Sequence, residues 1–253
     1  MGWTERLQQA LAAERALARQ VYDAGPDPES TFWPFVRHQQ EQFGLGSAEL
    51  RLPEHFRGRW EEAQVCFIGP HVLLVPEEPA PAVGAGVEEY LAYYRDRPEK
   101  RDPYGHYQAI MDGAPYLATE LVHWPCEKEL ALTVLKSKQG PAAVAAALEL
   151  TWAMLRESPV ETLVLTGNDA LKWVLPHLGW TGGALPGVTQ LHGQVLGRFG
   201  LPGAPGRELK VVASFHWSKE MPLFVRKVAG LGGLTPREAV SESRRMIARA
   251  IGA

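Results

Sequence analysis

Two kinds of hydrophobic pattern alternate along this chain. Short, continuously apolar runs are typical of strands buried on both faces of a sheet, and segments with apolar residues at helical spacing stand between them. Predicted strands span residues 65–69, 115–122, 162–166, 193–199 and 208–215, and predicted helices span residues 3–22, 32–36, 87–95, 103–111, 142–156 and 171–178. This alternation predicts an α/β fold, a three-layer α/β/α sandwich around a mainly parallel central sheet.

The chain shows no internal repeat and no obvious linker between domains. Residues 1–60 are interpreted as an N-terminal helical extension, and residues 61–253 as one compact α/β domain. Near the C-terminus, Thr235 is followed by Pro236 and then by Glu238, which predicts the capped start of a last helix.

Composition narrows the classes of function. The 253 residues carry a net charge of −3, so any contact with nucleic acid must come from a local basic patch. The two cysteines, Cys66 and Cys126, are too few for a four-cysteine iron–sulfur cluster. No apolar run reaches membrane-spanning length and no signal-peptide core is present, which predicts a cytoplasmic protein without membrane contact.

Motifs for cofactors and metals are missing from the sequence. There is no Walker-type phosphate loop, no dinucleotide fingerprint in a strand–helix context and no Gly-x-Ser-x-Gly elbow. His123 and Cys126 have the spacing of metal ligands, but no second pair completes a tetrahedral site. We therefore expect no cofactor and no metal.

Polar clusters follow each of the four predicted parallel strands. The clusters are Gly69-Pro70-His71, Glu120-Leu-Val-His123, Gly167-Asn168-Asp169 and His216-Trp-Ser218. Parallel strands deliver their carboxyl ends to one edge of a sheet, where ligands bind in open α/β folds. We therefore expect the four clusters to converge.

The order of these pieces resembles the uracil-DNA glycosylase superfamily. The segments that carry the resemblance are Phe67-Ile-Gly-Pro-His71, Ala118-Thr-Glu-Leu-Val122, Leu165-Thr-Gly-Asn-Asp-Ala170 and Ser214-Phe-His-Trp-Ser218. In that family a first strand ends in a Gly-containing catalytic loop and a middle strand ends in a uracil-recognising Asn. A later strand runs into a Gly-x-x-Ala helix, and the last strand ends in a His-Pro-Ser motif. The resemblance implies a DNA-repair glycosylase that hydrolyses the N-glycosidic bond of a damaged or mismatched base, with DNA as its partner.

Three positions depart from the family pattern. Glu120 stands where the family has the Asn, Trp217 replaces the Pro of His-Pro-Ser, and His71 occupies the place of the catalytic carboxylate or amide. An ionised Glu only accepts hydrogen bonds, so Glu120 is suited to the donor edge of cytosine, adenine or guanine. This favours a substrate other than uracil. The alternative for Glu120 is pairing with an Arg or a backbone N–H.

Two histidines are the candidate catalytic residues. His216 is placed to stabilise the departing base, and His71 to position the attacking water. The structural alternatives are a satisfied histidine at a strand end for His216 and an ordinary loop residue for His71. Trp124, or alternatively Trp217, is a candidate for stacking the base, with simple packing as its alternative.

The remaining candidates bind substrate or DNA. Gly69, Asn168 and Ser218 are assigned to substrate binding, Lys219 and Arg226 to phosphates, and Met221 to a wedge in the duplex. We expect a monomer that binds single- or double-stranded DNA through a local basic patch. Two other classes stay open: a non-catalytic nucleic-acid or nucleotide binder on the same fold, and a small-molecule hydrolase.

Overall fold

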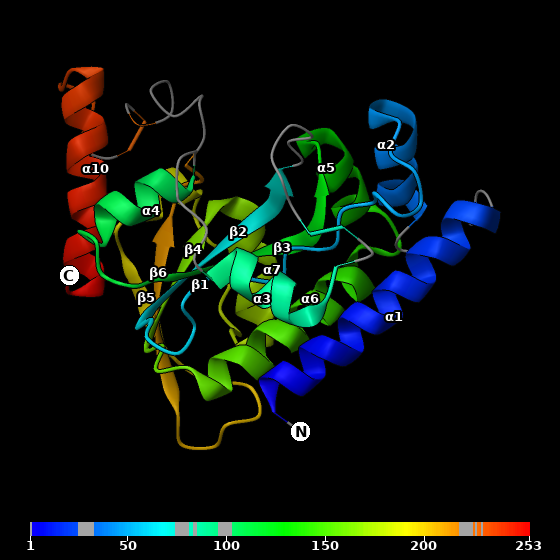
Figure 1. Ribbon diagram of the computed structural model, residues 1–253. Helices are drawn as coiled ribbons and strands as arrows, with labels where there is room; N and C mark the ends of the chain where they lie inside the picture. Colours follow the sequence, from blue (N-terminus) through cyan, green and yellow to red (C-terminus); the bar gives the residue numbers. More distant parts are fainter. Residues whose placement is uncertain are drawn as a thin grey trace. The chain divides into compact units, whose positions relative to one another are not determined.

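The computed structural model describes residues 2–24, 33–73, 81–82, 85–95, 103–217, 225, 227–228 and 230–253. The helices are α1 (Trp3–Ala24), α2 (Trp33–Phe43), α3 (Val87–Arg95), α4 (Tyr104–Ile110), α5 (Lys128–Lys136), α6 (Gly140–Glu157), α7 (Gly167–His177), α8 (Val188–Leu191) and α10 (Pro236–Ile251). The strands are β1 (Arg57–Gly58), β2 (Val65–Leu73), β3 (Leu117–Cys126), β4 (Thr162–Thr166), β5 (Val195–Gly200) and β6 (Glu208–Ser214). The predicted α/β class is confirmed (Figure 1).

The described strands form a six-stranded sheet in the order β1-β3-β2-β4-β6-β5. β2 pairs with β4, and β4 with β6, both in parallel, whereas β5 runs antiparallel to β6 at the edge. The sheet is therefore mainly parallel where it was predicted to be. The buried side chains of β4 explain this position, since a central parallel strand is covered on both faces.

Two strands end later than the sequence predicted. β2 continues through Pro70 and His71 to Leu73, and β3 continues through His123 and Trp124 to Cys126. The prediction that these polar clusters end their strands is therefore wrong. All ten side chains of β3 are buried, and a polar side chain tolerates burial when it is hydrogen-bonded. Polarity along the sequence consequently does not mark the end of this strand.

The chain divides into two compact units, each made of separate segments. Unit 1 contains Met1–Arg57, Pro70–Arg97 and Glu120–Glu157, and unit 2 contains Gly58–Gly69, Pro98–Thr119 and Ser158–Ala253. The boundary near residue 60, drawn from the sequence, stays a prediction.

In unit 1, α1 packs against α2 and α6 (Figure 1). The fully buried side chains of Trp3, Leu7 and Leu11 recur every four residues, so they form one apolar face of α1. α2 is longer than predicted, because its polar residue Gln39 is satisfied in the interior. The Gln39 Oε1 atom accepts a hydrogen bond from the backbone N–H of Arg51 at 2.7 Å.

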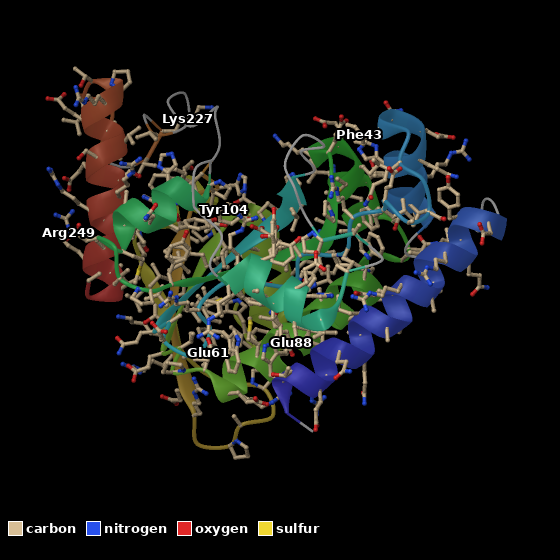
Figure 2. All side chains as sticks on the ribbon, viewed as in Figure 1. Phe43, Glu61, Glu88, Tyr104, Lys227 and Arg249 are labelled. Atoms are coloured by element: carbon tan, nitrogen blue, oxygen red, sulfur yellow. The ribbon has the colours of Figure 1, made fainter. Side chains whose placement is uncertain are left out.

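In unit 2, α10 lies alongside α4 (Figure 1). The predicted start of α10 is confirmed: Thr235 and Glu238 form a reciprocal capping box, and Pro236 opens the helix. Arg249 extends from the last turn of α10 into solvent (Figure 2). None of the described helices combines the length and apolar character needed to cross a membrane.

Candidate functional site

β4 and β6 end side by side at one edge of the sheet in unit 2, next to Gly69 of β2. The parallel register aligns Ile68 with Leu165 and Leu165 with Ala213. Gly69 directly follows Ile68, Gly167 lies two residues after Leu165, and His216 lies three residues after Ala213. The expected convergence holds for these three chain segments.

Gly167 makes the turn from β4 into α7 at this edge. Its φ of +91° lies in a region that residues with a Cβ atom rarely adopt. A Cβ atom built on Gly167 would also lie 3.4 Å from the Cβ atom of His216. A glycine here thus allows α7 to begin four residues earlier than predicted and brings its start next to the candidate catalytic histidine.

The backbone on both sides of His216 is held by buried side chains. The N–H of Phe215 donates a hydrogen bond to His192 Nδ1 at 3.3 Å, and the indole N–H of Trp217 donates to Ser214 Oγ at 3.0 Å. His216 itself is only half-buried. The imidazole of His216 is therefore partly accessible to solvent and projects from a backbone that its neighbours hold in place.

His192 acts as a neutral hydrogen-bond acceptor in this arrangement. Burial lowers the pKa of His192 to about 4, although a hydrogen bond with Ser243 opposes the shift. With Nδ1 unprotonated, Nε2 carries the hydrogen and faces Ser243, whose Oγ atom is 2.7 Å away. His192 was not singled out in the sequence, because its partners are far from it along the chain.

Trp217 has a packing role. It is fully buried, and its ring stacks on His106 with the centroids 4.8 Å apart and the planes at 28°. Nδ1 of His106 accepts hydrogen bonds from Nε and Nη2 of Arg244 on α10, at 3.1 and 3.0 Å. Trp217 therefore connects the chain after β6 to α4 and, through His106, to α10.

Below this edge, the buried side chains of β2, β4 and α4 contact one another. The rings of Phe67 and Tyr107 stack with centroids 4.1 Å apart, and both are fully buried. The Oγ1 atom of Thr166 donates to the Ile68 carbonyl at 3.1 Å and so joins β4 to β2 just before Gly69. Tyr104, labelled in Figure 2, begins the helix that supplies Tyr107.

Asn168, predicted to bind substrate, has a structural contact. Its Oδ1 atom accepts a hydrogen bond from the N–H of Val188 at 2.9 Å, although the residue as a whole is exposed. This bond ties the start of α7 to the start of α8. A role of Asn168 in binding a base stays a prediction.

Three other predicted site residues belong to unit 1. His71 lies within β2, and its pKa is lowered to about 4, first by burial and then by Lys128, against the opposing effect of Glu129. Glu120 lies in β3 and is 4% exposed. Trp124, also buried in β3, stacks on Phe35 with centroids 6.3 Å apart and planes at 6°, which gives one face of the indole to packing.

Four predicted DNA or substrate contacts, Ser218, Lys219, Met221 and Arg226, lie outside the described residues. Within the described part of the chain, no group of three or more His, Cys, Asp or Glu side chains is placed to hold a metal ion. Burial raises the pKa of the Cys126 thiol to about 12, so this thiol is not a ready ligand.

A cavity of about 450 Å³ lies at the other end of the parallel strands in unit 2, near the starts of β4 and β6. Its lining residues are Glu161, Arg198, Gly206, Arg207 and Glu208. Charges of both signs meet there, and Arg207 donates hydrogen bonds to the carbonyls of Ser158 and Val160 at 2.6 and 2.7 Å. We infer that Arg207 stabilises the backbone of the segment that leads into β4.

Neither a scan against protein-family models nor a search of curated proteins finds a match to this chain.

Proposed function

We propose that this protein is a DNA glycosylase that hydrolyses the N-glycosidic bond of a damaged or mismatched base. The observation that carries the proposal is the position of His216 beside Gly167, at the edge where the parallel strands β4 and β6 end next to Gly69 of β2. The order of the polar motifs along the chain supports the same interpretation. This edge is where α/β folds bind their ligands.

In this proposal, water adds across the bond between the base and C1′ of the sugar. The base leaves with the electron pair of the broken bond, the water oxygen bonds to C1′, and the proton that the water loses neutralises the departed base. His216 stabilises the negative charge on the departing base by donating a hydrogen bond from its ring. The hydrogen bonds of Phe215 and Trp217 support this role, because they fix the backbone from which the ring projects.

His71 and Glu120 keep the roles predicted from the sequence. The lowered pKa of His71 leaves its ring neutral near pH 7, so its unprotonated nitrogen can accept a hydrogen bond from the attacking water and position it. A carboxylate at Glu120 accepts hydrogen bonds from a base that presents N–H donors. We expect a monomeric, cytoplasmic protein whose partner is DNA. The predicted contacts with DNA or substrate are Lys219, Arg226, Ser218 and Met221. Trp124 is the predicted residue for stacking on the base.

The test is base release from oligonucleotides that carry uracil, hypoxanthine, xanthine or a mismatch. We expect abasic sites with at least one of them, and a loss of about a hundredfold or more in the His216→Ala variant. His177→Ala is the matched control, because His177 is exposed on α7. Release in His216→Ala at the wild-type rate contradicts the catalytic role of His216.

Two outcomes select other functions. Binding of duplex DNA that weakens with salt, without release of any base by folded protein, indicates a non-catalytic binder. The replacement of the family's Asn by the buried Glu120 is the feature that favours this second candidate. Absence of both release and binding rejects the DNA proposal.

A further inference from the structure

Unit 1 contains a buried chain of three hydrogen-bonded side chains that the proposed function does not use. Glu14 comes from α1, His55 from the segment before β1, and His123 from β3. Glu14 Oε2 lies 2.9 Å from His55 Nε2, and the Nδ1 atoms of the two histidines lie 2.6 Å apart. The side chains of His55 and Glu14 are 1% and 14% exposed, so the chain leads from the interior towards solvent.

Proton counting restricts the states of the two histidines. Two ring nitrogens 2.6 Å apart need one hydrogen between them, because two lone pairs or two N–H groups repel each other at this distance. A Glu14 carboxylate can only accept, so His55 Nε2 carries a hydrogen. The pair therefore holds together with at most one positive charge, which Glu14 balances.

Among the described residues, Glu14 is the carboxylate seen to hydrogen-bond directly to the histidine pair. The charged or titratable neighbours are Glu54 and Arg57 on the His55 segment, Tyr90 on α3 and Glu120 on β3. Arg57 and Glu54 neutralise each other through two hydrogen bonds of 2.6 and 2.7 Å. The Tyr90 hydroxyl accepts from the N–H of His55 and donates to the Pro53 carbonyl, and burial raises its pKa, so it carries no charge.

We propose that Glu14, His55 and His123 form an acid-sensitive histidine clasp. The clasp joins α1 to β3 within unit 1 through one shared proton, and uptake of a further proton opens it. Once the pair carries one positive charge, a further proton puts two N–H groups face to face and leaves two positive charges in a nearly dry interior. Separation of the rings relieves both the contact between the N–H groups and the repulsion of the charges, and it frees the part of α1 around Glu14 to open locally.

The environment of His123 agrees with this behaviour. Burial, and then the charge of His55, hold the pKa of His123 well below its usual range, while a hydrogen bond with the Glu120 backbone acts in the other direction. The clasp is consequently closed near neutral pH and opens in acid. The apolar contacts of Trp3, Leu7 and Leu11 remain, so we expect local opening of α1 and not global unfolding.

The first test uses the complete wild-type chain labelled with ¹⁵N. Near neutral pH we expect a scalar coupling across the hydrogen bond between the Nδ1 atoms of His55 and His123. As the pH is lowered stepwise from neutrality through the range in which the fold persists, we expect loss of this coupling and, at the same step, roughly tenfold faster opening of the α1 amides, after correction for intrinsic exchange. No coupling near neutral pH, or a coupling that persists while α1 opens, overturns the proposal.

The second test uses His123→Gln, which keeps a hydrogen-bond acceptor for His55 but does not titrate. We expect the extra opening of α1 in acid to disappear in this variant and to persist in His177→Gln on the exposed face of α7. An unchanged acid response in His123→Gln overturns the proposal. If the variant does not fold, the wild-type coupling and its pH dependence still decide, and neither test depends on base release.

Discussion

The backbone N–H of Phe215 donates its hydrogen bond to Nδ1 of His192, 3.3 Å away and 23 residues earlier in the chain. Both residues are buried, and their rings pack with centroids 4.2 Å apart. This hydrogen bond to the His192 ring holds the backbone just before His216.

His192→Phe should test the contribution of this hydrogen bond, because it keeps an aromatic ring but removes both nitrogens. The buried N–H of Phe215 and the hydroxyl of Ser243 then lose a partner, which costs about 1–3 kcal/mol in the free energy of unfolding. Urea denaturation measures the loss, and His177→Phe on the surface is the control. Equal stabilities of wild type and His192→Phe would mean that these hydrogen bonds contribute nothing net.

Acid should destabilise the protein through His71 and His192. Both have a pKa of about 4 in the folded chain, against an ordinary value of 6.5. Between these values the unfolded chain binds protons that the folded chain does not. The free energy of unfolding is therefore at its full value above about pH 6.5. Between that pH and the folded-state pKa values it falls by about 1.4 kcal/mol per pH unit for each histidine.

Denaturation curves recorded at several pH values between neutrality and about pH 4 measure this slope. The double variant His71→Gln, His192→Gln should have a shallower slope than wild type, whatever its stability near neutral pH. A slope equal to that of wild type would assign the acid sensitivity to other groups.

Gly167→Ala should be destabilising for a backbone reason. The φ of +91° is strained for any residue with a Cβ atom, and the new methyl group would contact His216. We expect a loss of about 1–3 kcal/mol in the free energy of unfolding. Gly183→Ala is the matched control, since Gly183 has open space around it, and thermal denaturation of both variants gives the comparison.

The cap of α10 offers a prediction of smaller size. Thr235→Ala removes the hydroxyl that accepts from the Glu238 N–H, which should cost about 1 kcal/mol. Thr235→Ser keeps the hydroxyl and should retain most of the stability. A Ser variant as unstable as the Ala variant would assign the effect to the methyl group of Thr235.

The elements that the sequence predicts best are those with strong local signals. β4 and α3 have the predicted bounds, and the start of α10 follows from the Thr235-to-Glu238 spacing. Predictions from local patterns fail where a polar side chain is buried because a residue distant in sequence hydrogen-bonds to it. His123 was expected at a strand end, yet it stays inside β3 because His55, 68 residues earlier, satisfies its ring.

The candidate site was predictable only in part. Strand order brings Gly69, Gly167 and His216 to one edge, as expected from a parallel sheet. The residues that hold this edge, such as His192 and His106, have no local signature, because their partners lie 23 and 138 residues away. The short helices α5 and α8 were missed for a similar reason, since each is stabilised by packing more than by a long apolar pattern.

The interleaved composition of the two units has a consequence for biosynthesis. The last segment of unit 1 ends at Glu157, whereas unit 2 needs the chain up to Ala253. A ribosome thus finishes everything that unit 1 requires while much of unit 2 is still untranslated. β2 therefore lacks its parallel partner β4 until residues 162–166 are synthesised, whereas both neighbours of β3 in the sheet, β1 and β2, precede it in the chain.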